Sequence, residues 1–433
     1  MYEIVIGRNQ KDRDKYALKG TVPIAKHYVR MGQVSSLANP VYIDAVKSHV
    51  IFICGKRGSG KSYTMGSLAE GIGLLDLEVR QNIATLIFDT MGVFWTMKYP
   101  NKQDIKLVEE WNLEEKEFNV NILVPYGLYD GLKEQGLPVD APFSIPISDL
   151  DGNSWCSVFD IDPMTPAGVF IQRVIDKAGS ESSFEAIERE AMNTPAEEHI
   201  KMLCLNLFGT AKTWGIFSDK GTPMSDLIKA GEITVLDISS YASTSQSQSL
   251  RGLIIALFCQ KIFEERMRAR KIEEFESVKK SIKYYVGRTE EKKMPMVWLF
   301  VDEAHEFLPK HGQTLASGPL ITLLREGRQP GISLVLASQQ PGQIHTDVLT
   351  QSDIVISHRL TAKIDIDALG LLMQSYMREG LDKVVNNLPR VNGSAIIFDD
   401  SNERMYPCQI RPRYTWHGGS SPSAIRDDDK RLF

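Results

Sequence analysis

The sequence has few cysteines and no long hydrophobic segment. Its five cysteines are scattered over 433 residues, and no two of them form a C-x-x-C pair. We therefore expect no zinc site and interpret the cysteines as small buried residues in a reducing cytosol. No apolar run approaches the roughly 18 residues that a membrane span needs, and no signal peptide opens the chain. These absences predict a soluble, cytoplasmic protein without a membrane anchor of its own.

An excess of basic residues is also absent. The 50 lysines and arginines are outnumbered by 55 aspartates and glutamates, which gives a net charge of −5. This balance argues against a protein that coats nucleic acid with a uniformly basic surface. It does not exclude a ring with a locally basic pore, because salt screens charge effects beyond about 10 Å.

A glycine-rich segment, 54–62, matches the phosphate-binding loop pattern G-x-x-x-x-G-K-[ST] without a mismatch. An apolar run precedes it and a helix-like segment follows it, as the loop requires. Glycines let backbone N–H groups turn toward phosphates, and the helix N-terminus adds a favourable dipole. Lys61 is expected to reach the β- and γ-phosphates, and Ser62 to ligate Mg²⁺. The predicted ATP-binding residues are Gly55, Gly58, Ser59, Gly60, Lys61, Ser62 and Tyr63.

A second apolar run, 296–301, ends in two carboxylates. An acid at this end of a strand is where phosphate-loop enzymes hold Mg²⁺ from the second side, and we assign that role to Asp302. Glu303 follows the strand end and is predicted to polarise the attacking water as general base. Residues 302–305 also spell the D-E-A-H helicase box. Helicases with that box usually place it much closer to the phosphate-loop lysine, so we interpret the match as a coincidence of letters.

Polar residues flank the next apolar run, 332–337. Gln339 follows the run and is predicted to sense the γ-phosphate, a role that suits it better than Gln340. Arg325 and Arg328 precede the run, and an arginine there can project into the nucleotide of the next subunit and stabilise transition-state charge. Either arginine taken alone also fits an ordinary surface salt bridge.

The order of apolar runs predicts an α/β fold with a mostly parallel sheet covered by helices. Residues 1–45 are predicted to form a small β-rich segment, 46–417 the ATPase domain, and 418–433 a flexible tail. The section between 89 and 233 does not resemble core sheet. We interpret about 100–230 as an inserted, mainly helical subdomain, with irregular loops over 125–163. The predicted strands are 50–54, 84–89, 233–238, 296–302, 332–337, 353–357 and 395–398.

These features together resemble the HerA branch of the HerA/FtsK translocases, from about residue 39 to 418. The resemblance implies a RecA-like ATPase that assembles as a hexameric ring and threads double-stranded DNA. Archaeal rings of this family dock a NurA-type nuclease for DNA end resection, and bacterial relatives act with effectors in antiviral defence. The resembling segments are 55–62, 88–92, 234–239, 301–309, 326–328 and 337–341.

The family pattern also implies roles for single residues. It supports Lys61, Ser62, Asp302 and Glu303 in the roles given above, and it favours Arg328 over Arg325 as the arginine that acts in trans. Arg251 is a weaker candidate for the subunit interface. Asp89 matches an acidic position at the end of the strand beside the loop, near the nucleotide.

Three features depart from the family pattern. Val93 stands where members usually have an acid, and Gln340 where many have arginine. The N-terminal segment is too short for the β-barrel that typically docks the nuclease, which leaves the partner's identity open.

Two segments are candidates for contact with DNA in a pore. The segment 279–293 carries six basic residues and two tyrosines, and 310–312 follows the acidic strand end; both also fit solvated loops. Two other functions stay open beside the DNA motor. One is a conjugation or secretion ATPase, and the other is a nucleotide-dependent ring scaffold that activates a partner enzyme.

Overall fold

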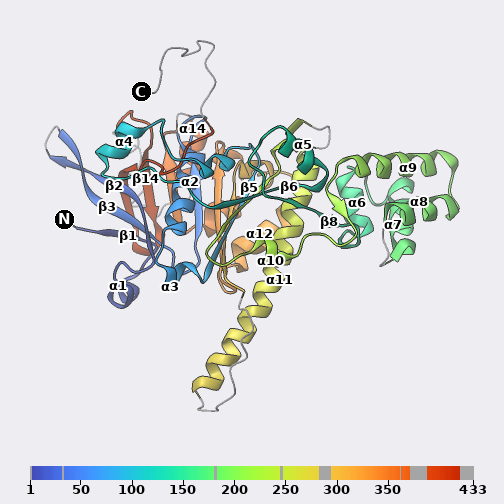
Figure 1. Cartoon of the computed structure of the whole chain (residues 1–433), viewed down its shortest axis with the longest axis horizontal. Coiled ribbons are helices and arrows are strands. Elements are labelled where there is room, and N and C mark those ends of the chain that lie inside the picture. The colour runs from blue at the N-terminus through green and yellow to red at the C-terminus, as the bar shows by residue number, and fades with distance from the viewer. Residues whose placement is uncertain are drawn as a thin grey trace, which may run out of the picture.

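The computed structural model describes residues 2–31, 34–179, 183–243, 247–281, 294–360, 362–370 and 388–419. Within these residues, thirteen strands form one sheet with helices on both faces (Figure 1). The strand order is β1-β3-β2-β15-β14-β13-β4-β12-β11-β5-β10-β6-β7. This is the α/β fold with a mostly parallel sheet that the sequence predicts.

The centre of the sheet is parallel from β13 to β7. Its strands are nearly continuous runs of valine, isoleucine, leucine and phenylalanine, because helices bury them on both faces. All seven predicted strands are confirmed to within one or two residues at their ends. They are β4 (Val50–Cys54), β5 (Ile83–Asp89), β10 (Ile233–Asp237), β11 (Met296–Val301), β12 (Ile332–Ser338), β13 (Ile354–His358) and β14 (Ser394–Asp399).

The N-terminal segment extends this sheet at one edge. The hairpin of β2 (Thr21–Met31) and β3 (Val34–Asp44) pairs with β15 (Arg404–Ile410), which in turn pairs with β14. β1 (Ile4–Ile6) lies parallel to β3 at the outer edge. The segment is β-rich, as expected, and its hydrogen bonds make it continuous with the central strands. A domain boundary at residue 45 therefore stays a prediction.

The section between 89 and 233 corrects one expectation. β6 (Val120–Pro125) and β7 (Ala141–Phe143) continue the main sheet beside β10, where the sequence analysis expected no sheet. Their apolar runs are short and lie among charged and loop-like residues. Only pairing with β10 distinguishes such a run from a buried turn. Helix α6 (Gly152–Val158) likewise lies where irregular loops were expected.

Some of the helices in that section form a lobe at one end of the molecule (Figure 1). Its helices are α6, α7 (Pro166–Ala178), α8 (Phe184–Asn193) and α9 (Glu198–Thr213). They close around Trp155, whose ring centroid lies 4.9 Å from that of Phe208 and 5.4 Å from that of Phe159. This aromatic cluster holds the helices of the lobe together and is continuous with the buried residues on one face of the main sheet.

Helices cover the two faces of the sheet differently. Helix α2 (Lys61–Gly73) packs its apolar side on one face with the β2–β3 hairpin. On the other face lie α11 (Ser247–Ser281), α12 (Ser317–Glu326) and α13 (Thr346–Gln351). The remaining helices are α1 (Gln10–Tyr16), α3 (Leu77–Arg80), α4 (Ile105–Glu110), α5 (Tyr129–Glu134), α10 (Met224–Leu227) and α14 (Lys363–Gly370).

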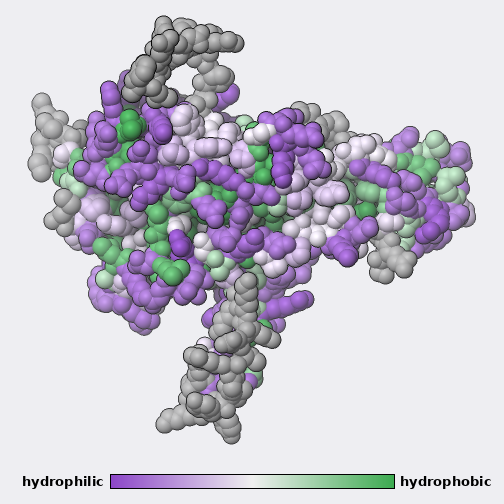
Figure 2. Space-filling model, viewed as in Figure 1, coloured by the Kyte–Doolittle hydropathy of each residue, from purple (hydrophilic) through white to green (hydrophobic). Residues whose placement is uncertain are grey.

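Helix α11 projects beyond the body of the molecule at its C-terminal end (Figure 1). Figure 2 shows that hydrophilic residues cover most of the visible face, with smaller apolar groups between them. Among the described helices, none combines the length and the apolar composition of a membrane span.

Candidate nucleotide-hydrolysis site

The phosphate loop connects the end of β4 to the start of α2. Gly58 and Gly60 have φ angles of +73° and +107°, which disfavour any residue with a side chain. At Gly55, a Cβ atom would lie 2.6 Å from the Cβ of His358. These glycines therefore let the loop turn tightly onto the N-terminus of a 13-residue helix, where N–H groups and the helix dipole favour an anion.

Lys61 and Ser62 begin that helix. Lys61 is 6% exposed, and its Nζ donates to the carbonyl oxygen of Lys56, 3.3 Å away within the loop. The Ser62 hydroxyl donates to Oδ2 of Asp302 at 2.6 Å. The structure thus brings together the two residues predicted to hold the metal, although β12 lies between their strands.

Asp302 directly follows β11 and is 1% exposed. Burial raises the pKa of its carboxyl group, while the Ser62 hydrogen bond opposes that shift. Its second oxygen accepts the backbone N–H of Glu303 at 2.8 Å. A buried carboxylate with one oxygen turned to the phosphate loop has the donor chemistry that Mg²⁺ prefers. Within the described ranges, no group of three or more histidine, cysteine or acidic residues forms a separate metal site.

Glu303 is held in a strained backbone conformation beside this pair. Its φ and ψ are +48° and +42°, a left-handed conformation that costs a non-glycine residue about 1–3 kcal/mol. Its Oε2 is buried without a hydrogen bond among the described residues and lies 3.5 Å from Nδ1 of His305. Burial and the neighbouring Asp302 carboxylate raise the pKa of Glu303 to about 7. Such strain and such a pKa are typical of a catalytic base.

Gln339 lies at the same edge of the sheet. It follows Ser338, which pairs with Cys54 at the end of β4, so Gln339 leaves the sheet beside the phosphate loop. It is half-buried, whereas Gln340 is exposed. The Ser338 hydroxyl lies 3.3 Å from His305 Nδ1, which links this strand end to Glu303. The role of Gln339 as γ-phosphate sensor stays a prediction.

The structure corrects the placement of Asp89. The family pattern places Asp89 on the strand beside the loop, but β12 and β11 lie between β4 and β5. Its carboxylate accepts the backbone N–H groups of Met91, Gly92 and Phe94 at 2.7–3.2 Å. Asp89 therefore organises the turn after β5, in register with Asp237 on β10. Its position gives no support to a contact with the nucleotide.

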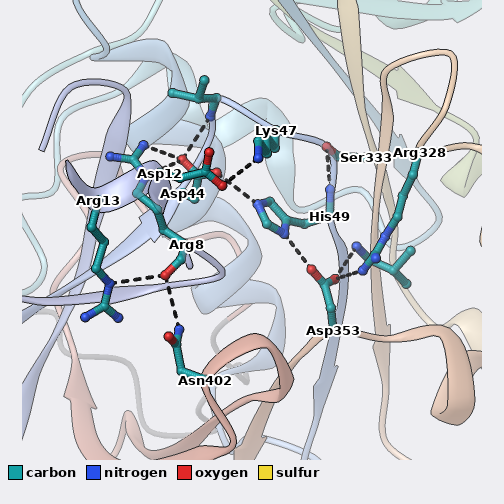
Figure 3. A network of polar contacts seen from close by, with 12 residues as sticks. Arg8, Asp12, Arg13, Asp44, Lys47, His49, Arg328, Ser333, Asp353 and Asn402 are labelled. Carbon is teal, nitrogen blue, oxygen red and sulfur yellow. Dashed lines mark hydrogen bonds and ion pairs between the residues drawn. The ribbon is translucent and has the colours of Figure 1, made fainter. Parts of the chain in front are cut away.

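The three arginines that were candidates for action on a neighbouring subunit have partners within the chain. Arg328 precedes β12, at the opposite end of that strand from Gln339, and its Nη2 lies 2.9 Å from Asp353 (Figure 3). Arg325 pairs with Asp347 at 2.7 Å, and buried Arg251 pairs with Glu306 at 2.8 Å. Arg328 is thus remote from the phosphate loop of its own chain.

Tyr63 contacts the C-terminal segment of the described chain. Its hydroxyl accepts the backbone N–H of Arg413 at 2.8 Å, and its ring meets that of His417 edge-on. The same segment is held by Glu70 of α2, which is fully buried between Arg411 and Arg413. Whether Tyr63 touches the nucleotide stays a prediction.

His358 is a residue of the site that sequence reasoning missed. It ends β13 and is buried, with Nε2 2.8 Å from the Thr64 hydroxyl and Nδ1 3.3 Å from the Ser394 carbonyl oxygen. Burial lowers its pKa to about 4, so the ring is neutral: Nδ1–H donates to the carbonyl and Nε2 accepts from Thr64. His358 thereby supports the loop and the first turn of α2. A lone histidine ending an apolar strand carries no sequence signal for this role.

Most of the first candidate segment for contact with DNA lies outside the described residues. Of the segment 279–293, residues 282–293 lie outside the described residues, as do residues 420–433 of the expected tail. Lys279 lies at the end of α11, with its Nζ 4.1 Å from the centre of the Phe275 ring. Lys310 is exposed, and its Nζ lies 3.5 Å from the Gly342 carbonyl oxygen.

The phosphate loop, the acidic strand end and the intervening strand define a RecA-like P-loop ATPase. The chain belongs to the family described as "Helicase HerA, central domain", whose model matches residues 29–258. This confirms the family resemblance. One relative, the "DNA double-strand break repair helicase HerA" of Pyrococcus furiosus, is 27% identical over 166 residues, which are 36% of this chain and 29% of the relative.

The chain is also similar to a second curated relative and to a solved structure. The "Probable DNA double-strand break repair helicase HerA" of Methanocaldococcus jannaschii is 48% identical over 60 residues, 14% of this chain and 12% of the relative. The matched segments thus span less than a third of either curated relative. The solved structure of VirB4 from Thermoanaerobacter pseudethanolicus superposes with a TM-score of 0.54 over 90% of this chain and 97% of VirB4. At 13% identity this similarity concerns the fold alone.

Proposed function

We propose that this chain is the subunit of an ATP-hydrolysing hexameric ring that translocates double-stranded DNA. In this proposal the ring acts with a nuclease of the NurA type or with a defence effector, in DNA end processing or antiviral defence. The observation that carries hydrolysis is the 2.6 Å hydrogen bond between Ser62 and Asp302, with Glu303 beside it. DNA as the substrate is supported by the HerA family match and by the relatives named as DNA repair helicases.

Each residue of the site has a separate role in phosphoryl transfer. The loop N–H groups and Lys61 hold the phosphates, and Glu303 orients and deprotonates the attacking water. The Ser62 hydroxyl and an Asp302 oxygen are hard donors that fit Mg²⁺, which neutralises charge on the phosphates when bound. In this proposal Gln339 senses the γ-phosphate and transmits its presence to β12. These roles require ATP and Mg²⁺ as cofactors.

A ring is supported by the position of Arg328. Its side chain is 50% exposed and lies at the opposite end of β12 from the phosphate loop of its own chain. A nucleotide that Arg328 contacts would therefore belong to a neighbouring subunit. An arginine supplied in trans is a recurring way to stabilise the transition state of phosphoryl transfer.

Two alternative functions retain the ATPase but differ in the process that it drives. A conjugation or secretion ATPase shares the fold, but the VirB4 likeness at 13% identity does not favour that activity over DNA translocation. A ring scaffold that activates a partner enzyme would need nucleotide but no movement along DNA.

The test is the ATPase rate of the purified oligomer with and without linear duplex DNA. We expect stimulation by duplex DNA that weakens as salt rises, since phosphate contacts dominate such binding. Lys61→Ala, which lacks the phosphate-binding amine, is the matched inactive control. A rate that DNA leaves unchanged would contradict the motor and favour the scaffold.

A further inference from the structure

Arg328 is the outer end of a row of charged side chains that alternate in sign. Its Nη2 meets Oδ1 of Asp353 at 2.9 Å, and Oδ2 of Asp353 lies 2.6 Å from Nδ1 of His49 (Figure 3). Nε2 of His49 lies 3.3 Å from Oδ2 of Asp44, whose other oxygen pairs with Arg8. The row therefore runs from a surface arginine to a buried one through two carboxylates and an imidazole.

Burial changes sharply along the row. The Arg328 side chain is half exposed, whereas Asp353 is 8% exposed and the three residues beyond it are 3% exposed or less. Both ring nitrogens of His49 face carboxylates, so the ring donates on both sides as an imidazolium. Asp353 also accepts the backbone N–H of Val50 at 2.8 Å, which fixes its carboxylate at the start of β4. The inner four residues thus form a buried support for one half-exposed arginine.

The members of the row come from separate parts of the chain. Arg8 and Asp44 belong to the N-terminal segment, where Arg8 also donates to the carbonyl oxygens of Ala17 and Lys19. His49 directly precedes β4, the strand that ends at the phosphate loop, and Asp353 directly precedes β13. The N-terminal segment is therefore tied electrostatically both to the strand of the loop and to Arg328.

We propose that Asp353, held by His49, Asp44 and Arg8, positions Arg328 for the nucleotide of the neighbouring subunit. This inference rests on the proposed function, in which Arg328 acts in trans. An exposed arginine samples many rotamers, and a fixed buried carboxylate restricts the guanidinium while most of its N–H groups stay available. In this proposal the N-terminal segment, through Arg8 and Asp44, holds that carboxylate in place. A row with only a structural role would stabilise the fold without affecting ATP hydrolysis in the neighbouring subunit.

The experiment measures steady-state ATP hydrolysis by the assembled full-length protein carrying Asp353→Asn. Asparagine keeps an oxygen for the Val50 N–H and loses the charge that faces Arg328. We expect kcat to fall about tenfold, a part of what a trans-acting arginine contributes, with KM for ATP within about twofold of wild type. Asp353→Glu, which keeps the charge, should recover most of the lost rate.

Asp347→Asn is the matched control, because it removes the partner of Arg325, which lies three residues before Arg328, without touching the row. This control should keep the wild-type kcat. An Asp353→Asn protein that also keeps the wild-type kcat would overturn the inference.

Mixed rings separate action on the neighbour from damage to the variant's own site. Lys61→Ala subunits cannot hydrolyse ATP but offer a correctly positioned Arg328. Mixing them with Asp353→Asn subunits should therefore restore part of the rate. A mixture as slow as the variants alone would place the defect within the variant subunit and contradict the inference.

Two further measurements keep the outcomes distinct. A wild-type kcat for Arg328→Ala would refute the trans-acting arginine of the proposed function itself. A reduced kcat for Arg328→Ala together with a wild-type kcat for Asp353→Asn would refute only the positioning role of Asp353. Thermal unfolding and oligomer mass are recorded for each variant. If Asp353→Asn does not assemble, Asp44→Asn replaces it, with an expected two- to fivefold loss of kcat and the same recovery in mixed rings; a wild-type rate would overturn the inference.

Discussion

The hydroxyl of Ser62 and the carboxylate of Asp302 share a 2.6 Å hydrogen bond although 240 positions separate them in the chain. Their strands, β4 and β11, are not neighbours, because β12 lies between them. Strands lie about 4.8 Å apart, so the contact spans two strand spacings and depends on Ser62 opening the helix above the sheet. The two halves of the hydrolysis site therefore meet because of the strand order and the position of α2.

Glu303→Gln tests the assignment of the base. Glutamine keeps the size of the side chain but cannot accept a proton, so we expect kcat to fall by about 10²–10⁴ while ATP still binds. Single-turnover hydrolysis and equilibrium binding of ATP measure the two effects separately. Hydrolysis at the wild-type rate would remove Glu303 from this role.

Gly60→Ala tests the need for a left-handed backbone in the loop. With φ at +107°, alanine should lower the free energy of unfolding by about 1–2 kcal/mol and weaken ATP binding. Gly131 in helix α5 is the matched control, since its φ is not positive and a Cβ atom added there would meet nothing within 4 Å. Gly131→Ala should raise stability by about 0.5–1 kcal/mol. Urea unfolding compares the two, and equal effects would contradict the argument.

Glu70→Gln tests the attachment of the C-terminal segment to α2. The Glu70 carboxylate accepts from Arg411 and Arg413 at 3.0 Å and from the Thr415 hydroxyl at 2.6 Å. Burial opposes its ionisation, but the charges of Arg413 and Arg411 outweigh burial and lower the pKa of Glu70. Removing the charge leaves two buried guanidinium groups unpaired, so we expect a loss of about 3–5 kcal/mol in the free energy of unfolding.

The control for Glu70→Gln is Glu185→Gln, which breaks a solvent-exposed pair with Lys212. Exposed pairs contribute little, so its effect should stay below about 1 kcal/mol. A similar small effect for Glu70→Gln in chemical denaturation would show that the contacts of Glu70 with Arg411 and Arg413 do not stabilise the fold.

His49 makes stability depend on alkaline pH. Burial opposes its charge, but hydrogen bonds to Asp353 and Asp44 outweigh burial and raise the pKa of His49 to about 9, with Arg8 and Arg328 beyond the two carboxylates. A raised histidine pKa contributes stability that is complete below about pH 6.5 and is lost as pH rises through 9. The loss should amount to about 3 kcal/mol at most.

Urea unfolding between pH 6.5 and 9.5 checks this dependence. The wild type should lose stability over that range, and His49→Gln, which has no proton to lose, should show a flatter profile from a lower starting value. Parallel profiles for the two proteins would assign the alkaline loss to other groups.

Much of the hydrolysis site could be predicted before the structure was known, because it resides in local patterns. The loop at 54–62 combines glycine, lysine and serine at fixed spacing, and an apolar run that ends in Asp302 and Glu303 identifies the acidic strand. The seven predicted strands could also be identified from the sequence, since burial on both faces requires uninterrupted apolar residues.

Other parts were unpredictable because they depend on neighbours distant in sequence. The order of the strands separates Asp89 from the loop, and pairing with β10 turns the short run of β6 into sheet. His358 reaches Thr64 only because β13 lies beside β4. Nothing local marks Asp353 as the partner of Arg328.

Local sequence patterns specify which chemistry the chain carries: a phosphate loop, an acidic pair and a sheet rich in apolar strands, since each depends on residues close together along the chain. The three-dimensional fold specifies which of those residues meet. It joined Ser62 to Asp302, confined Asp89 to its own turn and anchored Arg328 on a buried row of charges far from its own loop. The reason is that strand order and burial, which no local stretch of sequence specifies, determine which of these residues lie next to one another.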